Sequence, residues 1–169
     1  MPSQSRSAAA TRISSAMQRY AALPLRAIVG GGFIQHGWAK IVKGPDAFSA
    51  ILQALHVPFP HVSAYLTISV ELLGGAALLF GAFVAWASIP TIVVLLTAMF
   101  TVHLPYGFSS IKIKAIVDGR AQFGPPGYEC DLLYIACILA LVFLSPGPWS
   151  MDSYRLRRCN ACELAEFPG

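Results

Sequence analysis

Charged side chains are scarce in this sequence of 169 residues. Lys and Arg number 12 and Asp and Glu number 8, together 12% of the chain, whereas a soluble globular domain carries roughly 25% charged residues. Hydrophobic residues make up 56% of the chain, and the mean hydropathy is +0.61. This composition excludes a disordered chain and argues against an ordinary soluble domain. It predicts an integral membrane protein with a single domain.

Several signatures of soluble enzymes are also missing. The sequence has no Gly-rich phosphate loop, no nucleophile elbow and no run of His at haem-like spacing. Cys159 and Cys162 form one C-x-x-C pair, but no second pair or nearby His completes a zinc site, so no metal site is predicted. A redox-active Cys159–Cys162 dithiol stays open as an alternative. The pI near 9.0 reflects basic tails and suits anionic lipid head groups rather than nucleic acid.

Long apolar stretches predict the membrane spans, because a bilayer-crossing helix needs about 20 apolar residues. Residues 62–104 hold only two ionisable groups, Glu71 and His103, and are long enough for two spans. The break between these spans is expected near Pro90, since Pro suits the first turn of a helix. The predicted spans are residues 21–42, 62–85, 87–105 and 130–146.

The predicted fold is therefore an all-α membrane protein, a four-transmembrane-helix bundle with short loops and basic termini. The bundle covers residues 20–152, between a basic tail at 1–19 and a C-terminal tail at 153–169. Residues 43–61 and 106–128 are expected to be connectors, the first with a short helix on the membrane surface. The tails hold slightly more basic residues than the connectors on the opposite side, which favours both termini on the cytoplasmic side.

Two ionisable groups are expected to meet inside the bundle. Glu71 lies roughly 14 Å into its span at about 1.5 Å per residue. Arg26 lies in the first third of a span that runs the opposite way. A charge inside a bilayer costs about 2.5–3.5 kcal/mol, so such groups usually face the bundle interior and pair. We expect an Arg26–Glu71 ion pair, which is either functional or a structural pair that fixes helix register.

Other ionisable residues gather toward one membrane face in this arrangement. They are His36 and Lys40 near the end of the first span, His103 at the end of the third, and Glu129 and Asp131 at the start of the fourth. Together they could bind a polar head group and move protons, because His titrates near neutral pH. The alternative is that side chains at the ends of spans, such as Lys40 and Asp131, extend to water.

Three segments in order resemble the DoxX family of membrane proteins. LRAIVGGGFIQHGWAKI (residues 25–41) is similar to the family's opening helix, with an Arg before a Gly-rich stretch and a His-Gly-x-x-Lys motif. VELLGGAALLFG (residues 70–81) places a Glu before Gly-Gly, as on the second helix. YECDLLYIACILALVFLSPGPWSMD (residues 128–152) resembles the last helix and its closing turn, with a small departure at Ser-Pro-Gly-Pro. The C-terminal C-x-x-C lies outside this pattern.

The resemblance implies a four-helix bundle in the bacterial inner membrane, related to a subunit of a thiosulfate:quinone oxidoreductase. It favours a quinone-facing membrane subunit of a redox complex, with electrons supplied by a partner subunit. A quinone head group would then lie among His36, Lys40, His103 and Glu129, although no motif shows a cofactor site. The alternatives are a non-catalytic assembly subunit and a small proton-linked transporter centred on Glu71, for which a homo-oligomer could supply a missing half.

Overall fold

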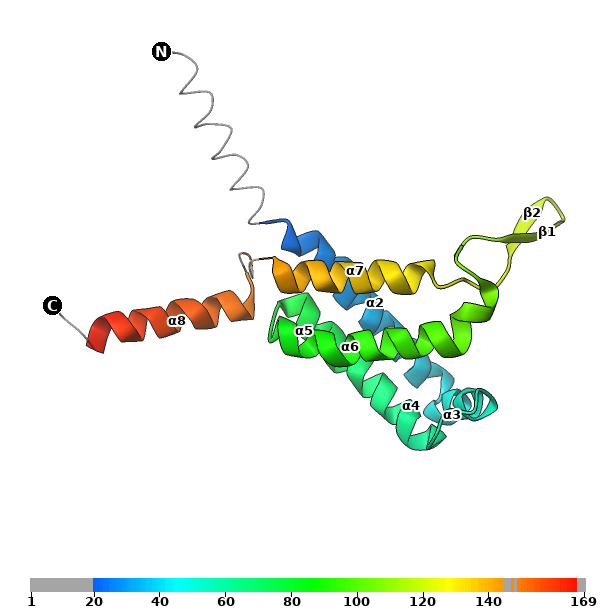
Figure 1. Ribbon diagram of the computed structural model, residues 1–169, viewed down its shortest axis with the longest axis horizontal. Helices are drawn as coiled ribbons and strands as arrows, with labels where there is room; N and C mark the ends of the chain where they lie inside the picture. The colour runs from blue at the N-terminus through cyan, green and yellow to red at the C-terminus, as the bar shows by residue number, and fades with distance from the viewer. Residues whose placement is uncertain (1–19, 145–146, 148, 167–169) are drawn as a thin grey trace, which may run out of the picture.

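The computed structural model describes residues 20–144, 147 and 149–166, with side chains described as far as Arg158. Figure 1 shows a bundle of helices from which a hairpin projects at one end and a further helix at the other. The predicted basic tail at 1–19 lies outside the described residues, whereas most of the predicted C-terminal tail at 153–169 is helical. The described helices are α2 (Ala22–Lys43), α3 (Pro45–Ala54), α4 (Pro60–Ser69), η1 (Val70–Gly74), α5 (Gly75–Phe80), α6 (Val84–Ala98), η2 (Met99–His103), η3 (Leu104–Tyr106), α7 (Glu129–Phe143) and α8 (Met151–Glu166).

Two helices within the described residues are long and apolar enough to cross a bilayer, judged by length and composition. Pro60–Phe80 runs continuously through α4, the π-helical η1 and α5. Val84–Tyr106 runs through α6, the π-helical η2 and the 3₁₀ turn η3. Helix α2 is 22 residues long but carries basic residues, and α7 has only 15 residues. The structure therefore establishes a largely helical protein with two membrane-capable helices.

The break between these two helices differs from the prediction. We expected it near Pro90, but the chain turns at Gly81 and Phe83, both in the left-handed region with φ of 62° and 50°. Pro90 lies inside α6. Ser88 and Thr91, on either side of this proline, donate hydroxyl hydrogen bonds to the carbonyls of Val84 and Ala87, four residues earlier in the same helix.

Helices α2 and α5 pack closely against each other in the bundle. A Cβ added at Gly30 would lie 2.7 Å from the carbonyl oxygen of Gly75, so these helices touch backbone to backbone. The two helices run antiparallel, as do α2 and α7 (Figure 1). A buried apolar cluster fills the space between α2, α5 and α7. It consists of Val29, Phe33, Leu78 and Ile138.

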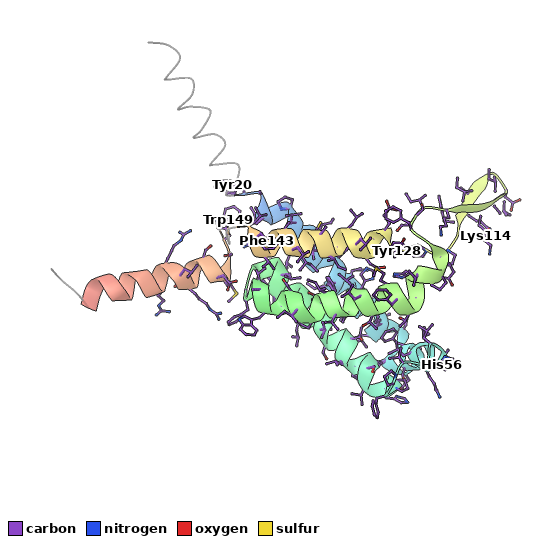
Figure 2. All side chains as sticks on the ribbon, viewed as in Figure 1. Tyr20, His56, Lys114, Tyr128, Phe143 and Trp149 are labelled. Carbon is purple, nitrogen blue, oxygen red and sulfur yellow. The ribbon has the colours of Figure 1, made fainter. Side chains whose placement is uncertain are left out.

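A β-hairpin occupies most of the connector between α6 and α7, which makes the all-α prediction incomplete. Strands β1 (Ile113–Val117) and β2 (Arg120–Phe123) pair antiparallel, and all of their residues are exposed. Asp118 and Gly119 form the turn with φ of 50° and 72°. An Asp-Gly pair between two apolar runs is a strong hairpin signal because both turn residues must adopt positive φ. Lys114 is labelled on this hairpin in Figure 2.

Candidate functional site

Lys40 and Glu71 form an ion pair inside the bundle. Lys40 Nζ lies 2.6 Å from Glu71 Oε1 and 2.7 Å from Oε2, so one ammonium group binds both carboxylate oxygens. The Glu71 side chain is 7% exposed and that of Lys40 is 22% exposed. The ammonium also lies 5.0 Å from the centre of the Phe48 ring. These contacts compensate the charge of a carboxylate in an apolar setting.

The expected Arg26–Glu71 pair is therefore wrong, because the register between the antiparallel helices differs from the one assumed. A Cβ at Gly37 would lie 3.1 Å from Glu71 Cβ, whereas a Cβ at Gly81 would lie 2.5 Å from Arg26 Nη2. Arg26 is thus level with Gly81, ten residues beyond Glu71. That separation is about 15 Å along a helix, which is beyond the reach of the side chain.

A second pair joins the end of η2 to the start of α7. His103 Nδ1 lies 2.5 Å from Asp131 Oδ2. The Asp131 side chain is 6% exposed, while that of His103 is 25% exposed. A carboxylate on Nδ1 fixes the orientation and tautomer of the ring and leaves Nε2 as the nitrogen for other partners. We predicted that both residues lie at this end of the bundle, and the structure brings them into contact.

The acid of the first pair and the histidine of the second lie in π-helical segments. Glu71 belongs to η1 and His103 is the last residue of η2. A π-helical segment inside an α-helix widens one turn and is frequently found at functional sites. These two ionisable groups thus lie in widened turns of otherwise apolar helices, and each contacts an ionisable side chain of another helix.

Two residues of the expected cluster, Glu129 and His36, form no hydrogen bond or ion pair with either of these pairs. Glu129 Oε2 accepts a hydrogen bond from the backbone N–H of Ser110 at 3.0 Å and so fastens the hairpin connector to α7. Tyr128 lies at the same place (Figure 2), with its ring 5.5 Å from that of Phe108. His36 is exposed on α2, and no hydrogen bond or ion pair joins it to another described residue. The structure therefore does not join into one cluster the four residues that we expected around a quinone, since Lys40 pairs with Glu71 and His103 with Asp131.

The other end of the bundle holds a buried arginine. Arg26 is 3% exposed and lines a small pocket together with Asp152, whose negative charge acts on the guanidinium. Asp152 also accepts hydrogen bonds from the backbone N–H groups of Phe83, at 2.8 Å, and Val84, at 3.2 Å. It therefore caps the start of α6 from α8. The sequence pointed to Asp152 only as part of the closing turn. The Ser-x-Asp spacing there was the signal that could have indicated its role at the start of a helix.

Loss of the Asp152 cap should weaken the contact between α8 and α6. Asp152→Ala leaves two N–H groups without an acceptor and removes the negative charge beside the buried Arg26, so we expect a loss of at least about 1–2 kcal/mol in the free energy of unfolding. Asp46→Ala is the matched control, because Asp46 also lies in a first helical turn but its side chain is 87% exposed. That change should cost less than about 0.5 kcal/mol. Equal losses for the two variants, measured by thermal unfolding in detergent, would contradict the capping role.

The structure describes the side chains of two of the four cysteines. Cys130 is exposed and Cys137 is half-buried, and both are free thiols on α7. Cys159 and Cys162 belong to α8, but their side chains lie outside those that the structure describes. A redox role for the C-x-x-C pair therefore stays a prediction. Among the described residues, no group of three or more His, Cys, Asp or Glu side chains is placed to hold a metal ion.

Comparison with known proteins agrees with the resemblance carried by the first two motifs. The DoxX family model matches residues 21–104, which is about half of the chain and includes Lys40, Glu71 and His103 but not Asp131. No curated protein and no solved structure matches the chain. The matched range covers α2, Pro60–Phe80 and all but the last two residues of Val84–Tyr106. By this match the chain belongs to the DoxX family of membrane proteins.

Proposed function

We propose that this DoxX protein is a membrane subunit of a quinone-linked redox complex, with the quinone head group at His103. The observation that carries the proposal is the His103–Asp131 pair, in which a buried carboxylate orients a partly exposed imidazole. Imidazole N–H groups are suitable donors to a quinone carbonyl, and a carboxylate partner keeps the ring ready to exchange a proton.

The proposal places four helices in the inner membrane of a bacterium, with both termini on the cytoplasmic side. Two of them are the membrane-capable helices Pro60–Phe80 and Val84–Tyr106. Helix α2 packs antiparallel along the first through Gly30, and α7 packs on the second. A helix in contact with a span along its length lies at the same depth, and its basic side chains either pair inside or extend to the surface.

The chemistry requires electrons and protons from separate sources. Conversion of a quinone to the quinol takes up two electrons and two protons. In this proposal a partner subunit supplies the electrons from its own redox centre. His103 donates one proton through Nε2 and Asp131 stabilises the imidazolium form of the ring before that transfer. The second proton and the one that restores His103 come from water at the membrane surface.

Quinone binding tests the proposal. We would titrate the full chain in nanodiscs with short-tail benzoquinone and naphthoquinone. His103→Phe should raise the dissociation constant at least about tenfold, since it removes a hydrogen bond from a charged donor. Asp131→Asn should have a smaller effect in the same direction because the ring stays in place.

His36→Phe is the matched control, since it makes the same replacement on an exposed helix residue. It should leave the dissociation constant unchanged. Unaltered quinone affinity in a folded His103→Phe variant, or an equal loss in both variants, would exclude His103 as the head-group site.

A non-catalytic assembly subunit is the second candidate, and the Lys40–Glu71 pair favours it. Both carboxylate oxygens of Glu71 are held by one ammonium group, which is the arrangement of a structural pair that fixes helix register. The same contact counts against the transporter hypothesis, because proton carriage would require Glu71 to release Lys40. Proton uptake into proteoliposomes that is lost in Glu71→Gln would restore the transporter hypothesis.

A further inference from the structure

One face of α2 has no partner within the described residues. Its members recur at alternating intervals of three and four residues, the spacing of a seam that packs against another helix. Ile28, Trp38 and Val42 on this face are 64%, 57% and 69% exposed, and Gln35 is also exposed. We call this face the α2 seam, and it consists of Ile28, Gly31, Gln35, Trp38 and Val42.

Gln35 lies deep in the bilayer if α2 is a span, as proposed above. Gly37 contacts Glu71 and Leu72 across the antiparallel helices, so Gln35 is level with Leu73. Leu73 is about 5 Å from the middle of Pro60–Phe80 at about 1.5 Å per residue. An amide at this depth has no water to bind, and polar side chains there normally hydrogen-bond to another helix.

Two hydroxyl groups on the second membrane-capable helix, those of Thr97 and Thr101, do not raise this problem. The hydroxyl of Thr97 donates to the carbonyl of Val93 at 2.8 Å, and that of Thr101 donates to the carbonyl of Thr97 at 2.7 Å. Those groups are satisfied within their own helix and can face lipid. Gln35, by contrast, makes no hydrogen bond with any other described residue, so its amide needs a partner from outside the protomer.

Gly31 supplies the space for such a partner. A Cβ added at Gly31 would meet no atom of the chain within 4 Å, whereas one at the neighbouring Gly30 would clash with the backbone of α5. The open glycine lies one turn from Gln35 on the same seam. A small residue beside a polar one lets a second helix approach closely enough for its side chains to reach the amide.

We propose that the α2 seam is the interface of a homodimer in the membrane. Two copies inserted in the same direction are related by a twofold axis along the membrane normal, so residues at equal depth meet. Gln35 of one copy then meets the partner's Gln35. This contact is self-complementary, because an amide carries both a donor and an acceptor. The seam holds no charged side chain that would repel its own copy. A single polar residue in an apolar seam also fixes register and oligomeric state.

Cysteine cross-linking in native membranes tests the contact directly. We would place Gly31→Cys in the full chain with Cys130, Cys137, Cys159 and Cys162 changed to Ser. Leu73→Cys is the control because Leu73 lies at the same depth and is 73% exposed, but on another helix. Oxidation should give a disulfide-linked dimer for position 31 and none for position 73. Cross-linking at both positions, or at neither, would overturn the proposal.

The Gly31→Cys variant also tests, independently of dimer formation, whether α2 lies in the bilayer, which the homodimer proposal assumes. Gly31→Cys should not react with a membrane-impermeant maleimide before detergent is added. Reaction in intact membranes would remove α2 from the bilayer and would overturn both the placement and the homodimer. The quinone assignment does not enter this experiment.

Association measured on the purified chain gives the strength of the contact. Gln35→Leu should raise the dimer dissociation constant about 3-fold to 15-fold, as expected for one interhelical hydrogen bond in a membrane. Gln53→Leu, which removes an exposed Gln from α3, should leave it unchanged. Gly31→Leu should abolish the dimer while the protomer keeps its unfolding temperature. A wild-type chain that is monomeric at all concentrations would mean that another protein covers the seam and would refute the homodimer.

Discussion

Replacement of Lys40 by Met is expected to destabilise the protein by about 3–5 kcal/mol, the usual cost of removing one partner from a buried ion pair. The Glu71 side chain is 7% exposed and both of its oxygens depend on Lys40. Without the ammonium group, the carboxylate must either stay charged in an apolar setting or take up a proton. The free energy of unfolding in mixed micelles, obtained from a denaturing-detergent titration, measures the loss.

A double variant shows whether the loss comes from leaving one buried charge without its partner. Lys40→Met combined with Glu71→Leu removes both charges, so it should recover most of the stability lost by Lys40→Met alone. Lys43→Met is the control for the loss of a basic residue, because Lys43 is exposed in the last turn of the same helix. It should change stability by less than about 0.5 kcal/mol. A double variant less stable than Lys40→Met would show that the pair is not the source of the effect.

Gly30→Ala is the second change with a large expected effect. The added methyl group would lie 2.7 Å from the carbonyl oxygen of Gly75 and from the backbone nitrogen of Leu79. Because these are backbone atoms, α2 and α5 must move apart. We expect a loss of about 3 kcal/mol, at the upper end of the cost of overpacking.

The adjacent glycine supplies a matched control for this prediction. Gly31→Ala adds the same methyl group where no atom of the chain lies within 4 Å. The change should be neutral or stabilise the protomer by up to about 1 kcal/mol, because alanine is the better helix former. Thermal unfolding of both variants at low protein concentration compares them. A Gly31→Ala loss as large as that of Gly30→Ala would contradict the backbone contact between α2 and α5.

The placement of most helices could be predicted from sequence because apolar length and terminal glycines or prolines are local signals. Residues 21–42 and 130–146 were expected to be helices, and α2 and α7 lie there within a few residues. The interhelical turn was misplaced because Pro90 is a strong local signal for a break. The structure instead turns at Gly81, where Asp152 binds the start of α6 from a distant part of the chain.

The pairing of charges could not be predicted, because it depends on the register between helices. The sequence identified Arg26 and Glu71 as residues that need partners and placed Lys40 near the membrane face, where it could extend to water. In the structure Arg26 lies level with Gly81, ten residues beyond Glu71, and Lys40 is the cation that meets Glu71. His103 and Asp131 were expected at the same end of the bundle from the alternation of spans alone. Their contact requires in addition that α6 packs beside α7, which no local pattern specifies.

The measurement that tests the quinone assignment most directly is the amount of quinone that copurifies with the protein. The chain would be extracted from its native membrane in mild detergent, and bound small molecules would be extracted with solvent and identified by mass spectrometry. Close to one quinone per protomer in the wild-type protein, lost in His103→Phe and retained in His36→Phe, is the result that we predict. The absence of quinone from the wild-type protein, or its full retention in a folded His103→Phe variant, would contradict the assignment and favour the assembly subunit.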